Sequence, residues 1–234
     1  MCGRFLTPDE AAFERYFELA PPAGYRRSFN VAPSQLAAVI RTRRDGSRVA
    51  ELFVWGFKPH WAKRHWINAR AETVFTSSAF GNAARGRRCL VPAAGWYEWH
   101  GDRAPKQPYV HFRDEFAPIA FAGIWTTSSP PPGGDARERR EHGETSSEPP
   151  VRTFAILTRD ATPDIAHLHD RMPVVLAPED YAIWLDPDAD RGALERILAA
   201  PGPPVASRRV STRVNKPEHD DADLIRPLDD TGTG

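Results

Sequence analysis

Residues 89–100 read Cys-Leu-Val-Pro-Ala-Ala-Gly-Trp-Tyr-Glu-Trp-His. Apolar and aromatic residues of this kind are enriched in β-strands. Proline has no N–H to donate to a strand ladder, so we expect two strands, 89–91 and 95–100, separated by a break at Pro92. This pairing of short strands around a turn is the pattern from which the rest of the chain can be interpreted.

Short strands of the same type recur along the sequence. In residues 48–57, Val49, Glu51, Phe53 and Trp55 alternate with the residues of the opposite face, as in a half-buried strand. Further strands are expected at residues 109–112, 119–125 and 153–158.

Helix signals are fewer than strand signals. Thr7-Pro8-Asp9-Glu10 offers an N-cap, a proline at the first helical position and acidic residues in the first turn of a helix that ends before Pro21. Two more helices are expected at residues 178–185 and 191–198, the second capped by Asp190. The chain therefore predicts an α+β fold: one domain built on antiparallel or mixed, barrel-like β-sheet with flanking helices.

The domain is expected to cover residues 1–227. Residues 128–150 are rich in Pro, Gly and charged residues and are expected to form a flexible surface insertion between two strands. Residues 228–234 are expected to form a disordered tail.

Composition excludes several classes of protein. The 234 residues are 41% hydrophobic and 26% charged, which is ordinary for a globular chain. No apolar run is long enough to span a membrane, and the N-terminus lacks the apolar core of a secretory signal. Two cysteines cannot form a disulfide framework, so we expect a reducing, cytoplasmic setting.

The net charge of zero is the sum of two unlike parts. Residues 1–113 carry a net charge of +9 and residues 114–234 a net charge of −9, and 27 of the 31 basic residues are arginines. Five of the seven tryptophans lie in the basic part: Trp55, Trp61, Trp66, Trp96 and Trp99. Arginines interleaved with aromatic rings suit a groove for single-stranded nucleic acid. A solvated arginine-rich surface over a tryptophan-rich core fits the same composition, and both interpretations remain open.

Cys2 follows the initiator methionine directly. Removal of Met1 would expose an α-amine with an ordinary pKa near 8 beside a thiol with an ordinary pKa near 8.5. The amine can form a Schiff base with an aldehyde, and the neighbouring thiol can then close on the same carbon as a five-membered thiazolidine. Termini are usually unused, so a cysteine without function at this position remains the alternative.

Three further polar residues lie within apolar segments. An extended conformation of residues 66–72 would set Asn68, Arg70 and Glu72 on one face. Glu98 lies between two tryptophans, where burial would raise its pKa into the range useful for proton transfer, unless an arginine pairs with it. His169 can exchange protons near neutral pH or be a satisfied core histidine. His167 and His169 lack a third ligand at a recognisable spacing, so neither a metal nor another cofactor is expected.

Seven blocks of sequence together resemble a known family. They are MCGRF (1–5), FNVAPS (29–34), VWGF (54–57), INARAET (67–73), GWYEW (95–99), HDRMP (169–173) and STRVN (211–215). In this order they resemble the SOS-response-associated peptidase (SRAP) family of abasic-site processing proteins. The resemblance extends from residue 1 to about residue 227.

The resemblance implies a single α+β domain, expected to be monomeric, with a positively charged groove for single-stranded DNA that contains an abasic site. It implies that the protein removes its own Met1 and that Cys2 then joins the ring-opened abasic-site aldehyde through a thiazolidine, which protects the lesion; it leaves strand cleavage by a lyase reaction open. It further implies four active-site residues, Cys2, Asn68, Glu98 and His169, and four DNA-binding residues, Arg4, Asn30, Trp61 and Arg70.

One segment departs from the family pattern. The family often has another asparagine after Val214-Asn215, whereas residues 216–223 are acidic and contain none. Two other functions also fit the residues. An N-terminal-nucleophile cysteine peptidase or amidohydrolase would use Cys2 against an amide, and a non-catalytic nucleic-acid-binding module would use the arginines and tryptophans alone.

Overall fold

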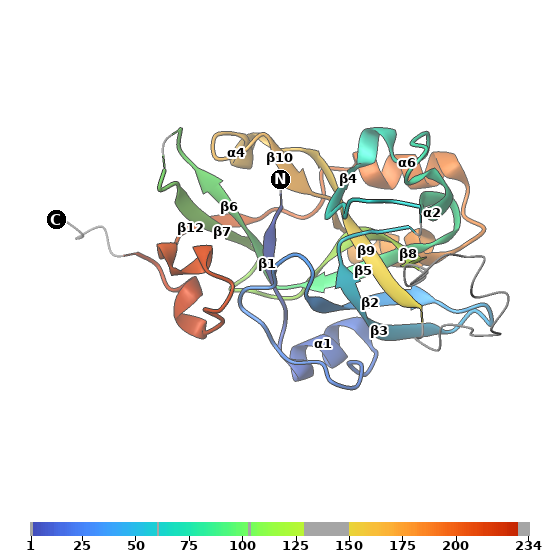
Figure 1. Cartoon of the computed structure of the whole chain (residues 1–234), viewed down its shortest axis with the longest axis horizontal. Helices are drawn as coiled ribbons and strands as arrows, with labels where there is room; N and C mark the ends of the chain where they lie inside the picture. The colour runs from blue at the N-terminus through green and yellow to red at the C-terminus, as the bar shows by residue number, and fades with distance from the viewer. Residues whose placement is uncertain (1, 60, 103, 129–149, 229–234) are drawn as a thin grey trace, which may run out of the picture.

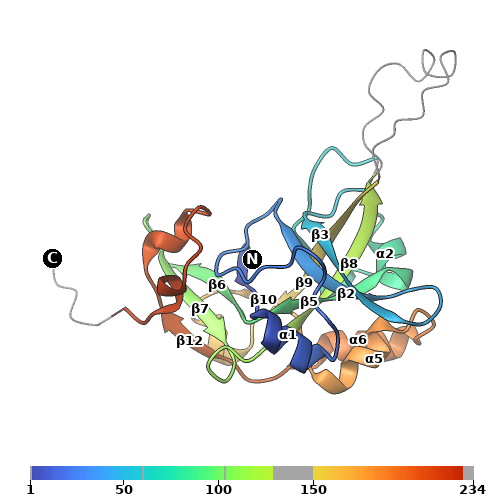
Figure 2. The ribbon, with the colours of Figure 1, turned by 90° about the horizontal axis from the view of Figure 1, so that it is seen from below.

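The structure of the chain, a computed structural model, describes residues 2–59, 61–102, 104–128 and 150–228. The predicted insertion at 128–150 and the predicted tail at 228–234 therefore lie almost entirely outside the described residues. Two β-sheets lie side by side, with helices along their outer faces (Figures 1 and 2).

The larger sheet has eight strands. In spatial order they are β10 (Arg171–Pro173), β9 (Val151–Asp160), β3 (Arg48–Trp55), β2 (Leu36–Thr42), β5 (Arg88–Ala93), β8 (Ile119–Ser128) and β11 (Val175–Leu176), with β4 (Asn68–Arg70) paired to β9. Strand β9 runs parallel to β3 and β4 and antiparallel to β8 and β10. Because β9 pairs with both β3 and β8, strands β3, β2, β5, β8 and β9 close into a ring. The expected mixed, barrel-like α+β fold is confirmed.

The smaller sheet has four antiparallel strands. In spatial order they are β1 (Arg4–Leu6), β6 (Gly95–His100), β7 (Gln107–Phe112) and β12 (Ala206–Arg209). Strand β5 of the larger sheet and β6 of the smaller sheet are separated by a single residue, Ala94. Residues 88–100 thus join the two sheets.

The expected break at Pro92 is wrong. Strand β5 continues through Pro92, which pairs with Ala120 of β8, and the break falls at Ala94. In the part of the chain that the structure describes, β2 pairs with β5 only at Leu90. Pro92 therefore lies beyond the ladder with β2, where its missing N–H costs little.

The helices are short. They are α1 (Glu10–Phe17), η1 (Ala71–Thr73), α2 (Gly81–Gly86), α4 (Pro163–Ala166), η2 (Pro178–Asp180), α5 (Tyr181–Leu185), α6 (Arg191–Ala199), η3 (Thr212–Asn215) and η4 (Ala222–Ile225). Helix α5 packs against β5, and α2 packs against β8. The helix expected at 178–185 is divided into η2 and α5, whereas α6 is capped as expected by Asp190, whose carboxylate accepts from Ala193 N at 3.0 Å.

The first helix begins two residues later than the sequence suggested. Asp9, not Thr7, is the N-cap: its side chain accepts from Ala12 N at 2.8 Å. The Thr7 hydroxyl instead accepts from Ser28 N, also at 2.8 Å. The carboxylate of Asp9 can reach the free N–H groups of the first turn, and Pro8 consequently precedes the helix.

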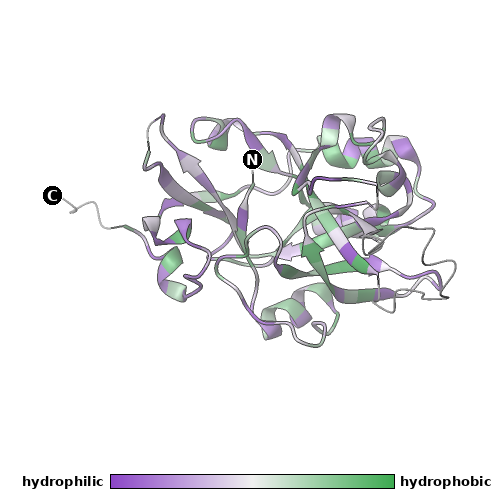
Figure 3. Ribbon diagram, viewed as in Figure 1, coloured by the Kyte–Doolittle hydropathy of each residue, from purple (hydrophilic) through white to green (hydrophobic). Residues whose placement is uncertain are grey.

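The apolar core follows the strands, and the hydrophobic residues in Figure 3 concentrate there. One buried cluster includes residues from both sheets and contains Cys2, Phe5, Trp55, Trp96 and Phe121. Within it Phe5 contacts Trp55 edge-on, with ring centroids 5.1 Å apart. Within the described residues, no helix combines the length and apolar character needed to cross a membrane.

Candidate active site

Cys2 lies in the core rather than at a loose end of the chain. Its exposed fraction is 0%. The residues that follow it form β1, which pairs with β6 in the register Phe5↔Trp96. Phe5 and Leu6 are both fully buried, in two different apolar clusters. The start of the described chain is therefore anchored where the two sheets meet (Figure 1).

Asn68 lies on the larger sheet and contacts Cys2. It is the first residue of β4, and its Nδ2 donates to the Cys2 carbonyl oxygen at 2.8 Å. Its Oδ1 is buried and accepts no hydrogen bond from any described residue. A buried acceptor without a donor is unfavourable, so Oδ1 is available to an N–H or O–H group that enters the site.

Glu98 lies close enough to Cys2 for its charge to act on the Cys2 thiol, and His169 faces Glu98. Glu98 lies on β6 of the smaller sheet with an exposed fraction of 2%, and its Oε2 is 3.7 Å from His169 Nε2. Burial raises the pKa of Glu98 to about 7 and lowers the pKa of His169 below its usual value. Both shifts oppose a permanent salt bridge, even though the separation alone would allow one. The pair instead suits transfer of a proton near neutral pH.

The Cys2 thiol is not a resting thiolate. Burial, and after it the negative charge of Glu98, raise the pKa of the Cys2 thiol well above its usual value. A reaction at the Cys2 sulfur therefore needs a base that removes the thiol proton. Glu98 is the carboxylate whose charge acts on the Cys2 thiol.

Extended structure in residues 66–72 is predicted correctly only in part. Asn68 and Arg70 share a face of β4, and Arg70 is exposed. The chain then turns into η1, which carries Glu72 away from that face. Glu72 reaches Arg171, whose Nη1 and Nη2 donate to its two carboxylate oxygens at 2.8 and 2.9 Å.

Arg171 was not singled out by its sequence. Its backbone N donates to His169 Nδ1 at 3.0 Å, and its guanidinium also donates to the Thr158 carbonyl oxygen at 2.7 Å. Thr158 was missed as well: its Oγ1 is buried and has no hydrogen-bond partner among the described residues. The only sequence signal for either residue is position, since Arg171 lies within the HDRMP block and Thr158 in an apolar strand.

Arg4 and Asn30 lie together, but Asn30 is buried. Arg4 Nη1 donates to Asn30 Oδ1 at 3.0 Å and to the Val214 carbonyl oxygen at 2.7 Å. Asn30 has an exposed fraction of 1%, and its Nδ2 lies within 3.2 Å of the carbonyl oxygens of Val214, Lys216 and His219. The Asn30 amide thus holds the start of the acidic segment 216–223 in place by hydrogen bonds. A direct contact between Asn30 and DNA stays a prediction.

Trp61 is the most exposed tryptophan of the described residues. Its exposed fraction is 56%, and its ring centroid lies 6.0 Å from that of Trp66, which in turn lies 5.7 Å from Phe80. An exposed ring supported by two further rings is a rigid apolar surface at the edge of the protein.

A metal centre finds no support in the parts of the chain that the structure covers. Within those residues, no group of three or more His, Cys, Asp or Glu side chains could hold a metal ion. The side chains of Cys2, Glu98 and His169 can themselves supply nucleophilic and acid–base chemistry.

Comparison with known proteins gives a consistent result. The chain is 31% identical over 240 residues to the abasic site processing protein YoaM of Bacillus subtilis (strain 168), a match that covers 96% of this chain and 97% of that one. It is 30% identical over 242 residues to the abasic site processing protein YedK of Escherichia coli (strain K12), covering 97% and 100% of the two chains. A crystal structure of a protein from Bacteroides thetaiotaomicron shares the fold, with a TM-score of 0.76 and 19% identity over 97% of this chain and 100% of that one. The family described as SOS response associated peptidase (SRAP) matches residues 1–217, and the chain belongs to that family.

Proposed function

We propose that this protein processes abasic sites by joining Cys2 covalently to the lesion in single-stranded DNA. The relatives named above are abasic site processing proteins, which supports the substrate class. The observation that carries the proposal is the burial of Cys2 next to Asn68 and near Glu98, which in turn faces His169. Chain termini without a function are usually loose, whereas this cysteine is buried next to an amide and near a carboxyl group.

The reaction begins with release of the Cys2 amine. Hydrolysis of the Met1–Cys2 bond consumes one water and yields free methionine and an α-amine on Cys2. We assign this step to the protein itself, because Cys2, whose nitrogen belongs to the scissile bond, lies near Glu98. The activity is thus an autopeptidase reaction that occurs once in the life of each molecule.

Cross-linking then requires two bond-forming steps. The Cys2 nitrogen attacks C1′ of the ring-opened sugar to give a carbinolamine, which loses water and becomes a Schiff base. The Cys2 sulfur adds to the same carbon, its proton is transferred to the nitrogen, and the thiazolidine ring closes. The sum is one amine, one thiol and one aldehyde converted into one thiazolidine and one water.

Each neighbouring residue has a role that its geometry can support. Glu98, with a pKa of about 7, accepts a proton from the Cys2 amine or thiol and returns it to the departing hydroxyl of the carbinolamine. Neutral His169 exchanges a proton with O4′ as the sugar ring opens. The free Oδ1 of Asn68 accepts from the Cys2 amine or from a sugar hydroxyl.

The DNA strand is held by charge and by stacking. Exposed Arg70 follows Asn68 on β4 and binds a phosphate, and Arg4 adds a second positive charge two residues after Cys2. Trp61 stacks on a base flanking the lesion.

The Trp61→Ala variant is expected to bind abasic single-stranded DNA about 5- to 150-fold more weakly, because stacking on one base contributes about 1–3 kcal/mol. The dependence of its affinity on salt should stay that of the wild type, because no phosphate contact is lost. Fluorescence anisotropy at several salt concentrations measures both. Ile183→Ala, which truncates an exposed apolar side chain on α5, is the control. An equal loss of DNA affinity in the Trp61→Ala and Ile183→Ala variants would contradict the stacking role of Trp61.

The intact mass of the purified protein tests the proposed function. The protein alone should have the mass of the chain without Met1, and incubation with an abasic oligonucleotide should add the mass of that oligonucleotide minus one water. An undamaged oligonucleotide should add nothing. Turnover of a peptide without a DNA adduct would favour the N-terminal-nucleophile hydrolase, and reversible DNA binding alone would favour the non-catalytic module.

A further inference from the structure

The His169 ring is held through the residue that follows Asp170. His169 Nδ1 accepts from Arg171 N at 3.0 Å and lies 3.1 Å from the Arg171 carbonyl oxygen. The Asp170 carboxylate, 3.0 Å from the same nitrogen, is 86% exposed and gives a weaker restraint. The orientation of the imidazole toward Glu98 therefore depends on where the backbone of Arg171 lies.

The backbone of Arg171 begins β10, which pairs with β9 at Asp160, and the Arg171 side chain adds a second restraint. The Arg171 side chain is 11% exposed, and its guanidinium makes a two-point contact with Glu72, at 2.8 and 2.9 Å. It also donates to the Thr158 carbonyl oxygen and to the Asp160 carboxylate. Paired contacts of this type between arginine and carboxylate restrict direction as well as distance. Asp160 is 88% exposed, so Glu72 is the better-ordered carboxylate partner.

Glu72 joins this loop to the element that carries Asn68. It lies in η1, directly after β4, whose first residue donates to the Cys2 carbonyl oxygen. The Glu72–Arg171 pair thus links the strand that positions Cys2 to the loop that positions His169, across 99 residues of sequence.

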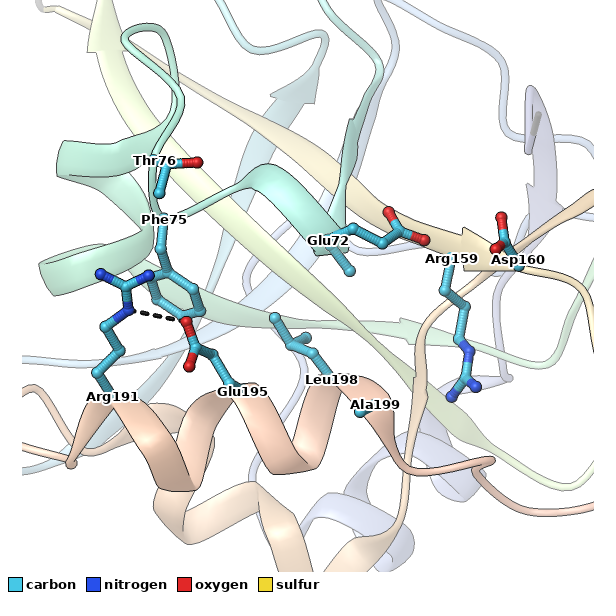
Figure 4. Close-up of a pocket in the computed structure, with 10 residues that line it drawn as sticks. Glu72, Phe75, Thr76, Arg159, Asp160, Arg191, Glu195, Leu198 and Ala199 are labelled. Carbon is cyan, nitrogen blue, oxygen red and sulfur yellow. Dashed lines mark hydrogen bonds and ion pairs between the residues drawn. The ribbon is translucent and has the colours of Figure 1, made fainter.

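We propose that Glu72 is a positioning residue that fixes His169 toward Glu98 and Cys2 by holding Arg171. This inference rests on the proposed function, in which His169 exchanges a proton with the sugar. Glu72 itself touches no reacting atom. It lies at one wall of a groove of about 420 Å³ between η1 and α6 (Figure 4).

The same groove supplies a matched control. Glu195 lines it from α6 and pairs with Arg191, with Nε and Oε1 2.8 Å apart. Both glutamates are partly exposed and pair with an arginine, but the Arg191–Glu195 pair lies within one helix and holds no part of the candidate site. Truncation of Glu195 therefore reproduces the loss of a surface ion pair without the loss of the link to His169.

The test compares Glu72→Ala, the isosteric Glu72→Gln and Glu195→Ala. In Glu72→Ala the cross-linking rate at saturating abasic DNA should fall about 10- to 100-fold, because small misplacement of a reacting group costs this much. Glu72→Gln should lie between Glu72→Ala and the wild type, and Glu195→Ala should equal the wild type. DNA affinity should stay within about threefold of the wild type, and melting temperatures within about 4 °C, because partly exposed ion pairs contribute little to stability.

A second measurement separates positioning from general destabilisation. In ¹⁵N-histidine spectra, assigned with a His169→Gln variant, the pKa of His169 should rise toward its usual value in Glu72→Ala, because the released loop exposes the ring to water. An unchanged rate together with an unchanged His169 titration in Glu72→Ala would overturn the proposal, as would equal losses in Glu195→Ala. If the wild type forms no adduct, the proposed function fails, and the His169 titration still reports whether Glu72 positions the ring.

Discussion

The Cys2→Ala variant is expected to form no stable thiazolidine adduct with abasic DNA, a loss of more than about a thousandfold relative to the wild type. The variant keeps the α-amine, so a Schiff base can still form, but the sulfur that closes the ring is absent and the imine returns to amine and aldehyde by hydrolysis. Removal of a nucleophile typically has effects of this size. Intact mass after incubation with abasic DNA, with and without borohydride to trap the imine, measures both products.

Cys89→Ala is the matched control for this loss. Cys89 is the other cysteine of the chain, is 0% exposed and belongs to the same apolar cluster as Cys2. Burial raises the pKa of the Cys89 thiol as well, and each substitution should lower the free energy of unfolding by about 1–2 kcal/mol through loss of packing. Only Cys2→Ala should lose the adduct. Normal adduct formation by Cys2→Ala, or its loss in Cys89→Ala, would contradict the proposed chemistry.

Glu98→Gln is expected to slow cross-linking by about 10²- to 10⁴-fold while it stabilises the fold at alkaline pH. The amide has nearly the shape of the carboxyl group but cannot accept a proton from the Cys2 amine or thiol. The rise of the wild-type rate with pH around the Glu98 pKa of about 7 should also disappear. Single-turnover rates between pH 5 and pH 9 measure both effects.

The effect on stability follows from the direction of the pKa shift. The folded protein holds a proton on Glu98 up to about pH 7, whereas the unfolded chain releases it near 4.5. The wild type therefore loses stability as pH rises through this window, on the order of 3 kcal/mol in total, and Glu98→Gln does not. The lowered pKa of His169 is present in both proteins, so its contribution to the pH dependence of stability cancels to first order. Equal pH dependence of unfolding in the two proteins would show that Glu98 is not the group responsible.

Local signals in the sequence predict most of the fold. The alternation in residues 48–57 gives β3, which ends only two residues early, at Trp55, because Gly56 takes a φ of +136° and turns the chain. Asp190 caps α6 because the cap requires only a carboxylate three residues before a free N–H. The sequence does not reveal that β5 continues through Pro92, because the cost of a proline depends on whether a neighbouring strand needs its N–H, which only the sheet arrangement decides.

For the candidate site too, local sequence indicates some residues, whereas others depend on contacts between distant parts of the chain. Cys2, Glu98 and His169 stand out because a thiol, a carboxyl group and an imidazole are conspicuous in apolar surroundings, and their assignment to an active site remains a prediction. The importance of Arg171 and Glu72 depends on a contact between residues 99 positions apart, which no local pattern records. The burial of Asn30 is likewise decided by where residues 214–219 cross it.

The pairing of β8 with β9 has an evolutionary and practical consequence. The ladder continues to Ser128↔Val151, so the chain leaves and re-enters the barrel at neighbouring points. Closing a loop between fixed, adjacent ends costs only about 0.6 kcal/mol more for each doubling of its length. Lineages can therefore lengthen or trim the connection at little thermodynamic expense, and the same junction is a natural position for grafting a fluorescent reporter or a targeting module, with the chain's own start left unmodified.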